Sequence, residues 1–399
     1  MIGAADFTLL IPTYDRTAEL GRLLRYLARH SMAYPILVLD SSHAAPRAAN
    51  RALIEGLDLD VRTLDFDSRV SPFEKFWRGS EQVATAFCAL CADDDIVLVD
   101  ALDELIAFLQ SHPDFHAAHG LYFNFVPGDP FRIGPLVYAG PSIAANTPVL
   151  RLRELLQQYE PVTYAVCGTE ALRRALGGAQ VLDSLMAREL TSGALMAIGA
   201  KIMRCPRLYY GRSEESSLAY ERWHPIEYLV RSPEDMVEEH ARSRHVLADA
   251  VQKAGDSPRG PGELLKLIDL ISLRYLAAYA SPEALDCILE GFLEGRDPRE
   301  VLARASPFLT PDRGSLADFL RRHTLVRQVR ARLAPNARLR HLTGLLGRHR
   351  DRVARRTTTT GRPRRYLLYG DFLRECAAVA RPRLERSVDT LLDALDGYE

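Results

Sequence analysis

The sequence predicts an α/β fold, in which a mostly parallel sheet flanked by helices is followed by an all-helical C-terminal domain. Short apolar runs alternate with helical patterns over the first hundred residues, and strand patterns end near residue 231. Of the 399 residues, 47% are hydrophobic and 26% are charged, which is the balance of a folded chain and not of a disordered one. We therefore expect two domains, 1–230 and 231–399.

Strand and helix patterns alternate along residues 6–110. Apolar runs predict strands at 6–11, 34–39, 60–66 and 86–92. Helices are expected from residue 17, with Thr17 as the N-cap, and at 48–56, 72–84 and 99–110. This order favours a parallel sheet with helices on both faces.

The rest of the chain is first mixed and then helical. We expect strands at 116–125, 162–167 and 201–210, helices at 170–175 and 185–199, and a long loop over the Pro- and Gly-rich stretch 127–148. Amphipathic spacing predicts further helices at 232–254, 263–280, 283–294, 315–334, 366–380 and 383–395.

The net charge of −1 conceals an asymmetry. The basic segment, residues 321–365, contains 15 Arg and one acid, so it carries +14 while the rest carries −15. Only four basic residues of the chain are Lys, which indicates a general preference for Arg. The basic segment is either a helical surface with Arg outward or a contact for an anionic membrane or lipid-linked acceptor; nucleic acid is a weaker alternative.

Neither a secretory signal nor an 18-residue apolar span is recognisable, so we expect a cytoplasmic protein, with peripheral contact at the inner face of the membrane as an option. Cys88 and Cys91 form the one close pair among six cysteines, and we interpret them as small core residues of a strand. Gly-rich phosphate loops, His-Glu-x-x-His and Gly-x-Ser-x-Gly are missing from the sequence.

Three consecutive acids, Asp93, Asp94 and Asp95, follow an apolar strand directly. The loop 12–16 and residues 40–42 also follow strands, and the carboxyl ends of parallel strands meet at one edge of a sheet. Like charges placed this close together repel unless a cation compensates them, and Mg²⁺ or Mn²⁺ with oxygen ligands suits that need. The alternative is a solvated acidic turn at a helix N-terminus.

The ordered motifs IPTYDR, LDSS and ADDD resemble the family 2 glycosyltransferases of the GT-A fold, in particular a bacterial branch with an Asp-Asp-Asp metal motif. The segments AAHGLYFNF, PVTYAVCGTEALRRAL and ELTSGALMAIGAKIMRCPRLYYGR are similar to the same branch. The resemblance covers residues 6–215, about half of the chain. It implies a GT-A nucleotide-sugar-binding catalytic domain at 1–230.

The resemblance also implies roles for individual residues. The nucleotide base is expected on Pro12, Thr13, Tyr14, Arg16 and Asp40, the ribose on Asp93 or Asp94, and Mn²⁺ or Mg²⁺ on Asp95 with Asp93 as a further ligand. A catalytic base belongs near the start of the helix before the last core strand, where Glu189 is the best match and Asp183 the second. Because the family's Glu-Asp pair is missing there, Glu189 as an ordinary exposed helix residue stays open.

The sequence also allows the surroundings of four further side chains to be predicted. Arg212 falls where relatives keep a basic residue near the diphosphate, with a plain surface Arg as the alternative. We expect His119 to be a buried, hydrogen-bonded histidine, with an acceptor ligand as the alternative. Lys75 and Arg78 are expected to be solvated, with a position facing phosphates as the alternative.

The sequence therefore predicts a metal-dependent glycosyltransferase that moves a sugar from a nucleotide-diphosphate sugar to a hydroxyl acceptor, with inversion. The acceptor, whether glycan, lipid-linked or protein, is left open. A sugar-phosphate nucleotidyltransferase and a non-catalytic nucleotide-sugar-binding or scaffold protein are the alternatives.

Overall fold

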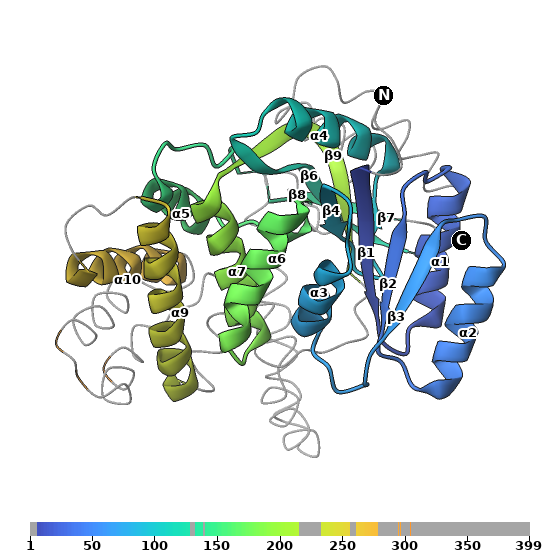
Figure 1. Cartoon of the computed structure of the whole chain (residues 1–399), viewed down its shortest axis with the longest axis horizontal. Coiled ribbons are helices and arrows are strands. Elements are labelled where there is room, and N and C mark those ends of the chain that lie inside the picture. Colours follow the sequence, from blue (N-terminus) through green and yellow to red (C-terminus); the bar gives the residue numbers. More distant parts are fainter. Residues whose placement is uncertain are drawn as a thin grey trace, which may run out of the picture.

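The computed structural model describes residues 6–127, 132–138, 140–214, 233–255 and 261–277, together with 294, 296 and 304. Within these ranges the chain forms one sheet covered by helices on both faces (Figure 1). The α/β class is therefore confirmed. The helices predicted from 283 onward and the basic segment lie outside the described residues.

The first part of the chain builds the parallel half of the sheet. Strands β3, β2, β1 and β4 lie side by side in that order and all pair in parallel. The elements in chain order are β1 (Phe7–Thr13), α1 (Thr17–Arg29), β2 (Ile36–Asp40), α2 (Ala44–Glu55), β3 (Val61–Asp65), α3 (Pro72–Glu81), β4 (Phe87–Leu90), β5 (Ile96–Val97) and α4 (Val99–Ser111).

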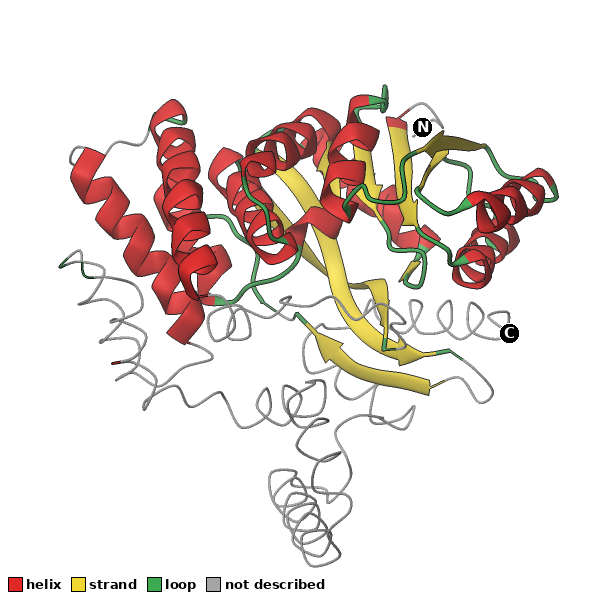
Figure 2. Ribbon diagram, turned by 90° about the horizontal axis from the view of Figure 1, so that it is seen from below, coloured by secondary structure: helices red, strands yellow, loops and turns green. Residues whose placement is uncertain are grey.

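The second part extends the sheet in the order β8, β6, β9 and β5. Strand β7 pairs with the C-terminal half of β6. β6 and β9 are the long strands that cross the molecule in Figure 2 and pair in parallel. The elements are β6 (Phe115–Val126), β7 (Arg132–Val137), α5 (Pro148–Gln157), η2 (Val162–Tyr164), β8 (Val166–Gly168), α6 (Thr169–Gly178), η3 (Ala179–Val181), α7 (Leu185–Gly199) and β9 (Lys201–Ser213).

The predicted loop 127–148 is partly wrong, because it contains β7. Gly134 and Pro135 hide this strand from pattern reading, although an edge strand such as β7 tolerates both residue types. The helix α5, which begins at the end of the same stretch, was also not predicted. Its N-cap is Thr147, whose Oγ1 accepts the Leu150 N–H at 3.4 Å.

The sheet is buried on both faces. Leu9 and Ile11 belong to the core beneath α1 and α4, whereas Leu10 belongs to the core beneath α3, α5, α6 and α7. Side chains alternate between the faces of a strand, so a continuous apolar run suits a strand covered on both sides.

Two C-terminal helices, α9 (Pro233–Lys253) and α10 (Pro261–Ala277), continue the second core. Val251 of α9 and Ile268 of α10 are fully buried in the same cluster as Phe73 of α3. Among the described helices, none combines the length and the apolar composition needed to cross a bilayer.

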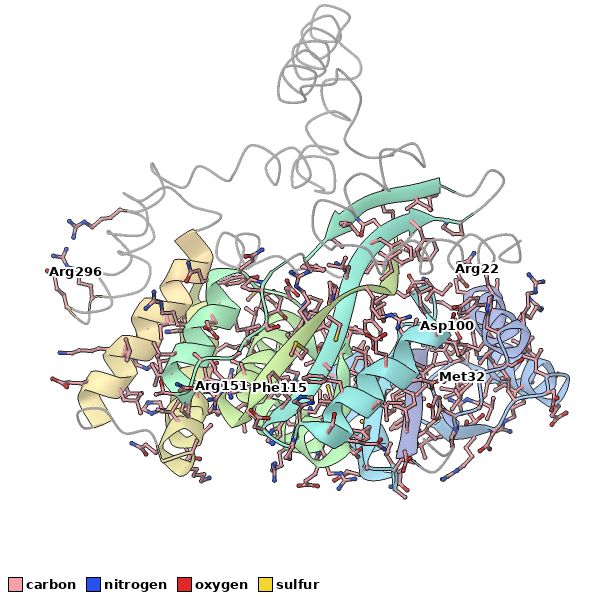
Figure 3. All side chains as sticks on the ribbon, turned by 90° about the horizontal axis from the view of Figure 1, so that it is seen from above. Arg22, Met32, Asp100, Phe115, Arg151 and Arg296 are labelled. Carbon is pink, nitrogen blue, oxygen red and sulfur yellow. The ribbon has the colours of Figure 1, made fainter. Side chains whose placement is uncertain are left out.

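Helix α7 is held at both ends by other elements. Arg151 of α5, labelled in Figure 3, donates from Nε and Nη2 to the carbonyls of Ala197 and Ile198, at 2.7 and 2.6 Å. At the other end, Glu239 of α9 accepts the Ser184 N–H at 2.7 Å. Both contacts satisfy backbone groups that a helix leaves unpaired at its ends.

Candidate functional site

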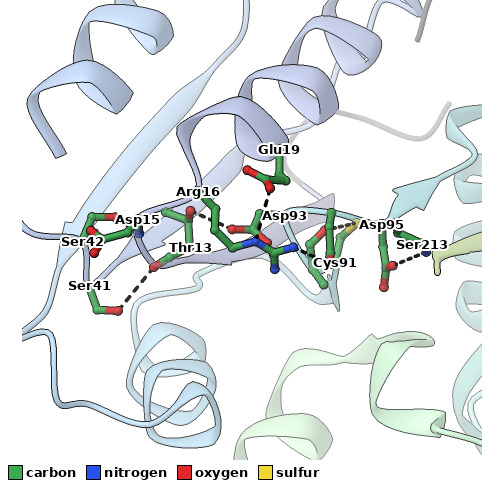
Figure 4. Close-up of polar contacts among 12 residues, drawn as sticks. Thr13, Asp15, Arg16, Glu19, Ser41, Ser42, Cys91, Asp93, Asp95 and Ser213 are labelled. Atoms are coloured by element: carbon green, nitrogen blue, oxygen red, sulfur yellow. Dashed lines mark hydrogen bonds and ion pairs between the residues drawn. The ribbon is translucent and has the colours of Figure 1, made fainter. Parts of the chain in front are cut away.

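The parallel strands bring the three predicted loops to one edge of the sheet. Thr13 is opposite Asp40 in the β1–β2 register, and Leu10 is opposite Leu90 in the β1–β4 register. Asp93, shortly beyond Leu90, therefore lies level with Thr13, whose hydroxyl donates to Asp93 Oδ2 at 2.8 Å (Figure 4). The predicted convergence of these loops is present in the structure.

Arg16 joins the first two acids of the triplet. Its guanidinium lies 3.0 Å from Asp93 Oδ1 and 2.6 Å from Asp94 Oδ2, and all three residues are buried. Burial acts to lower the pKa of Arg16, but the charges of Asp93 and Asp94 outweigh it and the pKa rises. Arg16, and not Thr17 as predicted, is the N-cap residue of α1, and its side chain makes no capping bond because it faces the acids.

Asp40, at the end of β2, is completely buried and accepts two hydrogen bonds. The Ser42 N–H donates to Oδ1 at 2.7 Å, and the Asn50 side-chain amide donates to Oδ2 at 2.9 Å. Such bonds hold the carboxylate in one orientation at the edge where the loops meet.

Lys75 was predicted to be solvated, and the structure corrects this. Only 3% of the residue is exposed, and Nζ donates to the Thr13 carbonyl at 3.0 Å and to Ser41 Oγ at 2.8 Å. Burial lowers the pKa of Lys75 to about 8, against the opposing charges of Asp93 and Asp40. Arg78, one turn along α3, is exposed as predicted and pairs with Glu74.

The loop after β1 presents Tyr14 at the rim of this group. Tyr14 is half-buried, and its ring centroid lies 5.7 Å from that of His43. Next to it, Asp15 has a left-handed φ of 53° and accepts the His43 N–H at 2.8 Å. Pro12 is half-buried opposite Leu39 in the register of β1 and β2. The loop is thereby fastened to the start of α2.

Asp95 belongs to a second group, formed where β5 meets β9. Ile96 is opposite Gly211, where a Cβ would lie 2.5 Å from the Ile96 side chain, so this approach requires glycine. Asp95 therefore lies beside Ser213, whose N–H donates to Oδ1 at 2.8 Å, and Tyr210 donates to Oδ2 at 3.0 Å. Burial raises the pKa of Asp95 to about 7, and the neighbouring Asp94 adds to this effect.

Glu189 is buried on α7, with 8% of the residue exposed, so it is not the ordinary exposed helix residue of the alternative. Tyr159 donates its hydroxyl to Glu189 Oε1 at 2.9 Å. Burial raises the pKa of this carboxyl to about 7, although the Tyr159 bond and the charge of Arg212 oppose the shift. A carboxyl that titrates near neutrality suits proton transfer.

Arg212 connects the groups of Asp95 and Glu189. Its charge lowers the pKa of both carboxyls. Burial acts to lower the pKa of Arg212, but Tyr138 and then Asp95 and Glu189 outweigh it and raise this pKa. The guanidinium donates to the Tyr138 hydroxyl, and Cζ lies 5.3 Å from the centroid of that ring. Asp95, Arg212 and Glu189 therefore form one electrostatic group.

Two other candidates lie outside this group. Asp183, the second candidate base, has a side chain that is 80% exposed and pairs with Arg242 at 2.7 Å. His119 is buried, as predicted, and its Nδ1 lies 2.9 Å from the Gly120 carbonyl. Cys88 and Cys91 are free, buried residues of the core.

The residues fit a metal held through one carboxylate. In the described part of the chain, no cluster of three or more His, Cys, Asp or Glu side chains could hold a metal ion by itself. Both carboxylates have both oxygens engaged: Thr13 and the cation Arg16 contact those of Asp93, whereas the neutral Ser213 N–H and Tyr210 hydroxyl donate to those of Asp95. Mg²⁺ is commonly bound through one or two carboxylates together with substrate phosphates and water. Asp95 suits such a shared site, and the metal stays a prediction.

Several residues of the site escaped sequence reasoning. They are Asn50, Tyr138, Tyr159 and Tyr210, all of which contact a predicted site residue. None of them carries a signal in the sequence. The tyrosines have no such mark, because a buried aromatic residue more often belongs to a core.

No family model and no curated protein matches the sequence. Among solved structures, S. aureus TarS 1–349 in complex with UDP-GlcNAc is 14% identical, covering 73% of this chain and 92% of that one, with a TM-score of 0.44. Another structure of S. aureus TarS is 16% identical, covering 75% and 50%, with a TM-score of 0.43. A mycobacterial protein is 14% identical, covering 64% and 77%, with a TM-score of 0.34.

Proposed function

We propose that the protein is a metal-dependent glycosyltransferase of the family 2 type, which moves a sugar from a nucleotide-diphosphate sugar to a hydroxyl acceptor with inversion. The observation that carries this proposal is the group of Asp95, Arg212 and Glu189, in which the charge of one arginine acts on two carboxyls whose pKa is raised by burial. It adjoins the edge where Asp40, Thr13 and Asp93 converge. Thr13, Asp40 and Arg212 lie at the carboxyl ends of strands that pair in parallel, where ligands of such sheets bind, and Glu189 is added from helix α7.

The donor would lie along this edge. The rim formed by Pro12 and Tyr14 and the buried Asp40 supply apolar, aromatic and acceptor contacts of the kind that hold a nucleotide base. Asp93 and Asp94 offer acceptors for ribose hydroxyls. Arg212 offers a fixed positive charge for the diphosphate.

The chemistry assigned to Glu189 is proton removal. As the acceptor oxygen bonds to the anomeric carbon, its proton passes to Glu189, and the bond from that carbon to the diphosphate oxygen breaks. Arg212 stabilises the negative charge that grows on the leaving diphosphate. A bound Mn²⁺ or Mg²⁺ at Asp95 would supply further positive charge there. Attack opposite to the leaving group inverts the anomeric carbon.

Thermal-shift measurement with UDP-, GDP- and CDP-sugars, with and without Mn²⁺, tests the proposal. We expect one donor class to raise the melting temperature, more strongly with Mn²⁺, and Asp95→Ala to remove the Mn²⁺ effect. Asp114→Ala is the matched control, because Asp114 is exposed and pairs with Lys201 away from the site. Stabilisation by none of these sugars would overturn the proposal.

Turnover separates an enzyme from the binding-protein alternative. Release of the nucleoside diphosphate, measured with a panel of glycan, lipid-linked and peptide acceptors, should depend on Glu189. Donor binding without release under any of these conditions would favour the non-catalytic alternative. The acceptor class and a membrane contact through the basic segment stay predictions.

A further inference from the structure

Glu189 lies on α7, and the residue that donates a hydrogen bond to it is in turn in contact with a C-terminal helix. These contacts involve Tyr159, in the connection between α5 and η2, and Tyr275 on α10.

Tyr159 is the side chain that directly fixes the carboxyl of Glu189. Its hydroxyl donates to Oε1 at 2.9 Å, and its ring passes over α7 one turn beyond Glu189, at Gly193. A Cβ at Gly193 would lie 3.8 Å from Tyr159 Cε2, which is van der Waals contact. The ring therefore lies against a part of the helix surface that carries no side chain.

The backbone next to Tyr159 is also fixed. Glu160 is buried, its side chain accepts the Gly140 N–H, and its carbonyl accepts the Val162 N–H at 2.8 Å. Tyr138, two residues before Gly140, receives the hydrogen bond from Arg212. The connection between α5 and η2 is thus held next to Tyr159 by the two hydrogen bonds of Glu160.

Tyr275 holds the ring of Tyr159 from the side of α10. The two ring centroids are 5.4 Å apart with an interplanar angle of 62°, a favourable edge contact. Tyr275 is itself buried, on the same face of α10 as Leu264, Ile268 and Ile271. The position of Tyr159 therefore depends on the docking of α10.

Helix α9 completes this support by fixing the start of α7. Glu239, which is buried, accepts the N–H groups of Asp183 and Ser184 at 2.5 and 2.7 Å. Thr191 of α7 also shares a hydrogen bond of 2.8 Å with Ser243 of α9. One C-terminal helix thus fixes the helix that carries Glu189, and the other fixes the tyrosine that orients it.

We propose that Tyr159 is a positioning residue for Glu189 and that Tyr275 of α10 keeps Tyr159 in place. This inference rests on the proposed function, since it assigns Glu189 as the base. The groups whose charge or hydrogen bond acts on Glu189 are Tyr159 and Arg212, and Tyr159 in turn faces Tyr138 and Tyr275. A hydrogen bond donated to a carboxylate favours its ionised form, so Tyr159 keeps the base ready to accept a proton.

The first experiment needs no substrate. Carbon-13 NMR of glutamate-labelled protein follows the titration of the Glu189 carboxyl, whose signal is identified by its loss in Glu189→Gln. Tyr159→Phe keeps the ring and removes the donor, so we expect the midpoint to rise by about one pH unit. Tyr34→Phe, which removes a hydroxyl that bonds Asp103 on the opposite face of the sheet, should leave it unchanged. An unchanged midpoint in Tyr159→Phe would overturn the inference.

The second experiment tests the link to α10. Tyr275→Ala removes the ring that holds Tyr159, and we expect a shift in the same direction but smaller. If that variant does not fold, Tyr275→Leu keeps apolar volume and removes the ring edge. If a folded Tyr275 variant has the same Glu189 titration midpoint as the wild type, the proposed role of α10 is refuted.

Kinetics separate positioning from a merely structural effect. With UDP-GlcNAc as the probe donor, release of UDP by Tyr159→Phe should fall about ten-fold at pH 6 and recover near pH 9, with the donor KM unchanged. A loss that is equal at all pH values would contradict positioning. If Glu189→Gln keeps full turnover, the assignment of the base fails, whereas the titration experiment still reports on the Tyr159 contact.

Discussion

The site has two halves, which differ in the groups that contact their acids. In the first half, beyond β4, Asp93 and Asp94 contact a cation of the chain. In the second half, Asp95 and Glu189 accept hydrogen bonds from neutral groups. Arg16 bridges Asp93 and Asp94, while Tyr210, Ser213 and Tyr159 donate to the other two. In the first half the arginine contacts the acids directly, so a change of Arg16 acts on an ion pair. In the second half Arg212 acts on both carboxyls through its charge, and its guanidinium contacts Tyr138.

The largest expected effect is on kcat, and it follows from removing the proposed base, Glu189, from the second half. Glu189→Gln keeps the shape and can still accept the Tyr159 hydroxyl, but it cannot take a proton. We expect kcat to fall by roughly 10²–10⁴-fold, with donor affinity, measured by calorimetry, nearly unchanged. Glu170→Gln on the neighbouring helix α6 is the control, because its side chain is 59% exposed. Equal kcat values for the two variants would show that Glu189 is not the catalytic base.

The next largest effect is on the free energy of unfolding, and it follows from removing the cation Arg16 from the first half. Arg16→Met leaves two buried carboxylates without their partner, and breaking such a contact costs about 3–5 kcal/mol of the free energy of unfolding. Urea unfolding measures this loss, and Arg78→Met, at an exposed pair, should cost under about 1 kcal/mol. Adding Asp93→Asn and Asp94→Asn should recover part of the loss. Without that recovery, Arg16 acts through packing and not through charge.

A third prediction concerns the pH dependence of stability. The pKa of Glu189 rises from 4.5 to about 7 on burial, so the folded protein binds a proton that the unfolded chain releases between these values. Stability contributed by the neutral carboxyl is therefore complete below pH 4.5 and is lost as the pH rises through 7. Glu189→Gln should match the wild type near pH 4.5 and exceed it by about 3 kcal/mol at pH 8. A constant difference in unfolding free energy at both pH values would argue against a buried, titrating Glu189.

The smallest predicted effect concerns the bond to Asp95. The Tyr210 hydroxyl accepts the Ala92 N–H at 3.1 Å and donates to Asp95, so Tyr210→Phe disturbs both groups. We expect a loss of about 1–3 kcal/mol in stability and weaker binding of the donor with Mn²⁺. Tyr209→Phe is the control, because it removes a hydroxyl that donates to the Tyr164 carbonyl at 2.8 Å and leaves the contacts of Asp95 in place. If both variants weaken donor binding equally, the Asp95 contact is not the cause.

Sequence reasoning could predict the first half of the site better than the second. Thr13, Asp40 and Asp93 meet because each follows a strand of one parallel sheet, which is a local signal combined with a general rule. The helix predicted at 185–199 agrees with α7, Leu185–Gly199. The burial of Lys75, by contrast, depends on the backbone at Thr13 passing over α3, and no pattern within α3 reports that contact.

The tyrosines of the second half show the same limit. Tyr159 and Tyr210 meet Glu189 and Asp95 across 30 and 115 positions of the sequence. Their positions depend on the pairing of β9 within the sheet and on the packing of α10 against α5 and α9. The strand β7, which leads to Tyr138, was hidden by its Gly and Pro. Pattern reading finds elements, whereas these contacts arise from their assembly.

The shared core beneath α9 and α10 has a consequence for protein synthesis. The face of the sheet under α1 and α4 can be covered as soon as β9 has formed, but the opposite face also requires residues as late as Ile268 and Tyr275. A nascent chain that has left the ribosome only as far as β9 therefore exposes apolar side chains of α5 and α7. The two faces of the sheet are therefore completed by segments that leave the ribosome at different times.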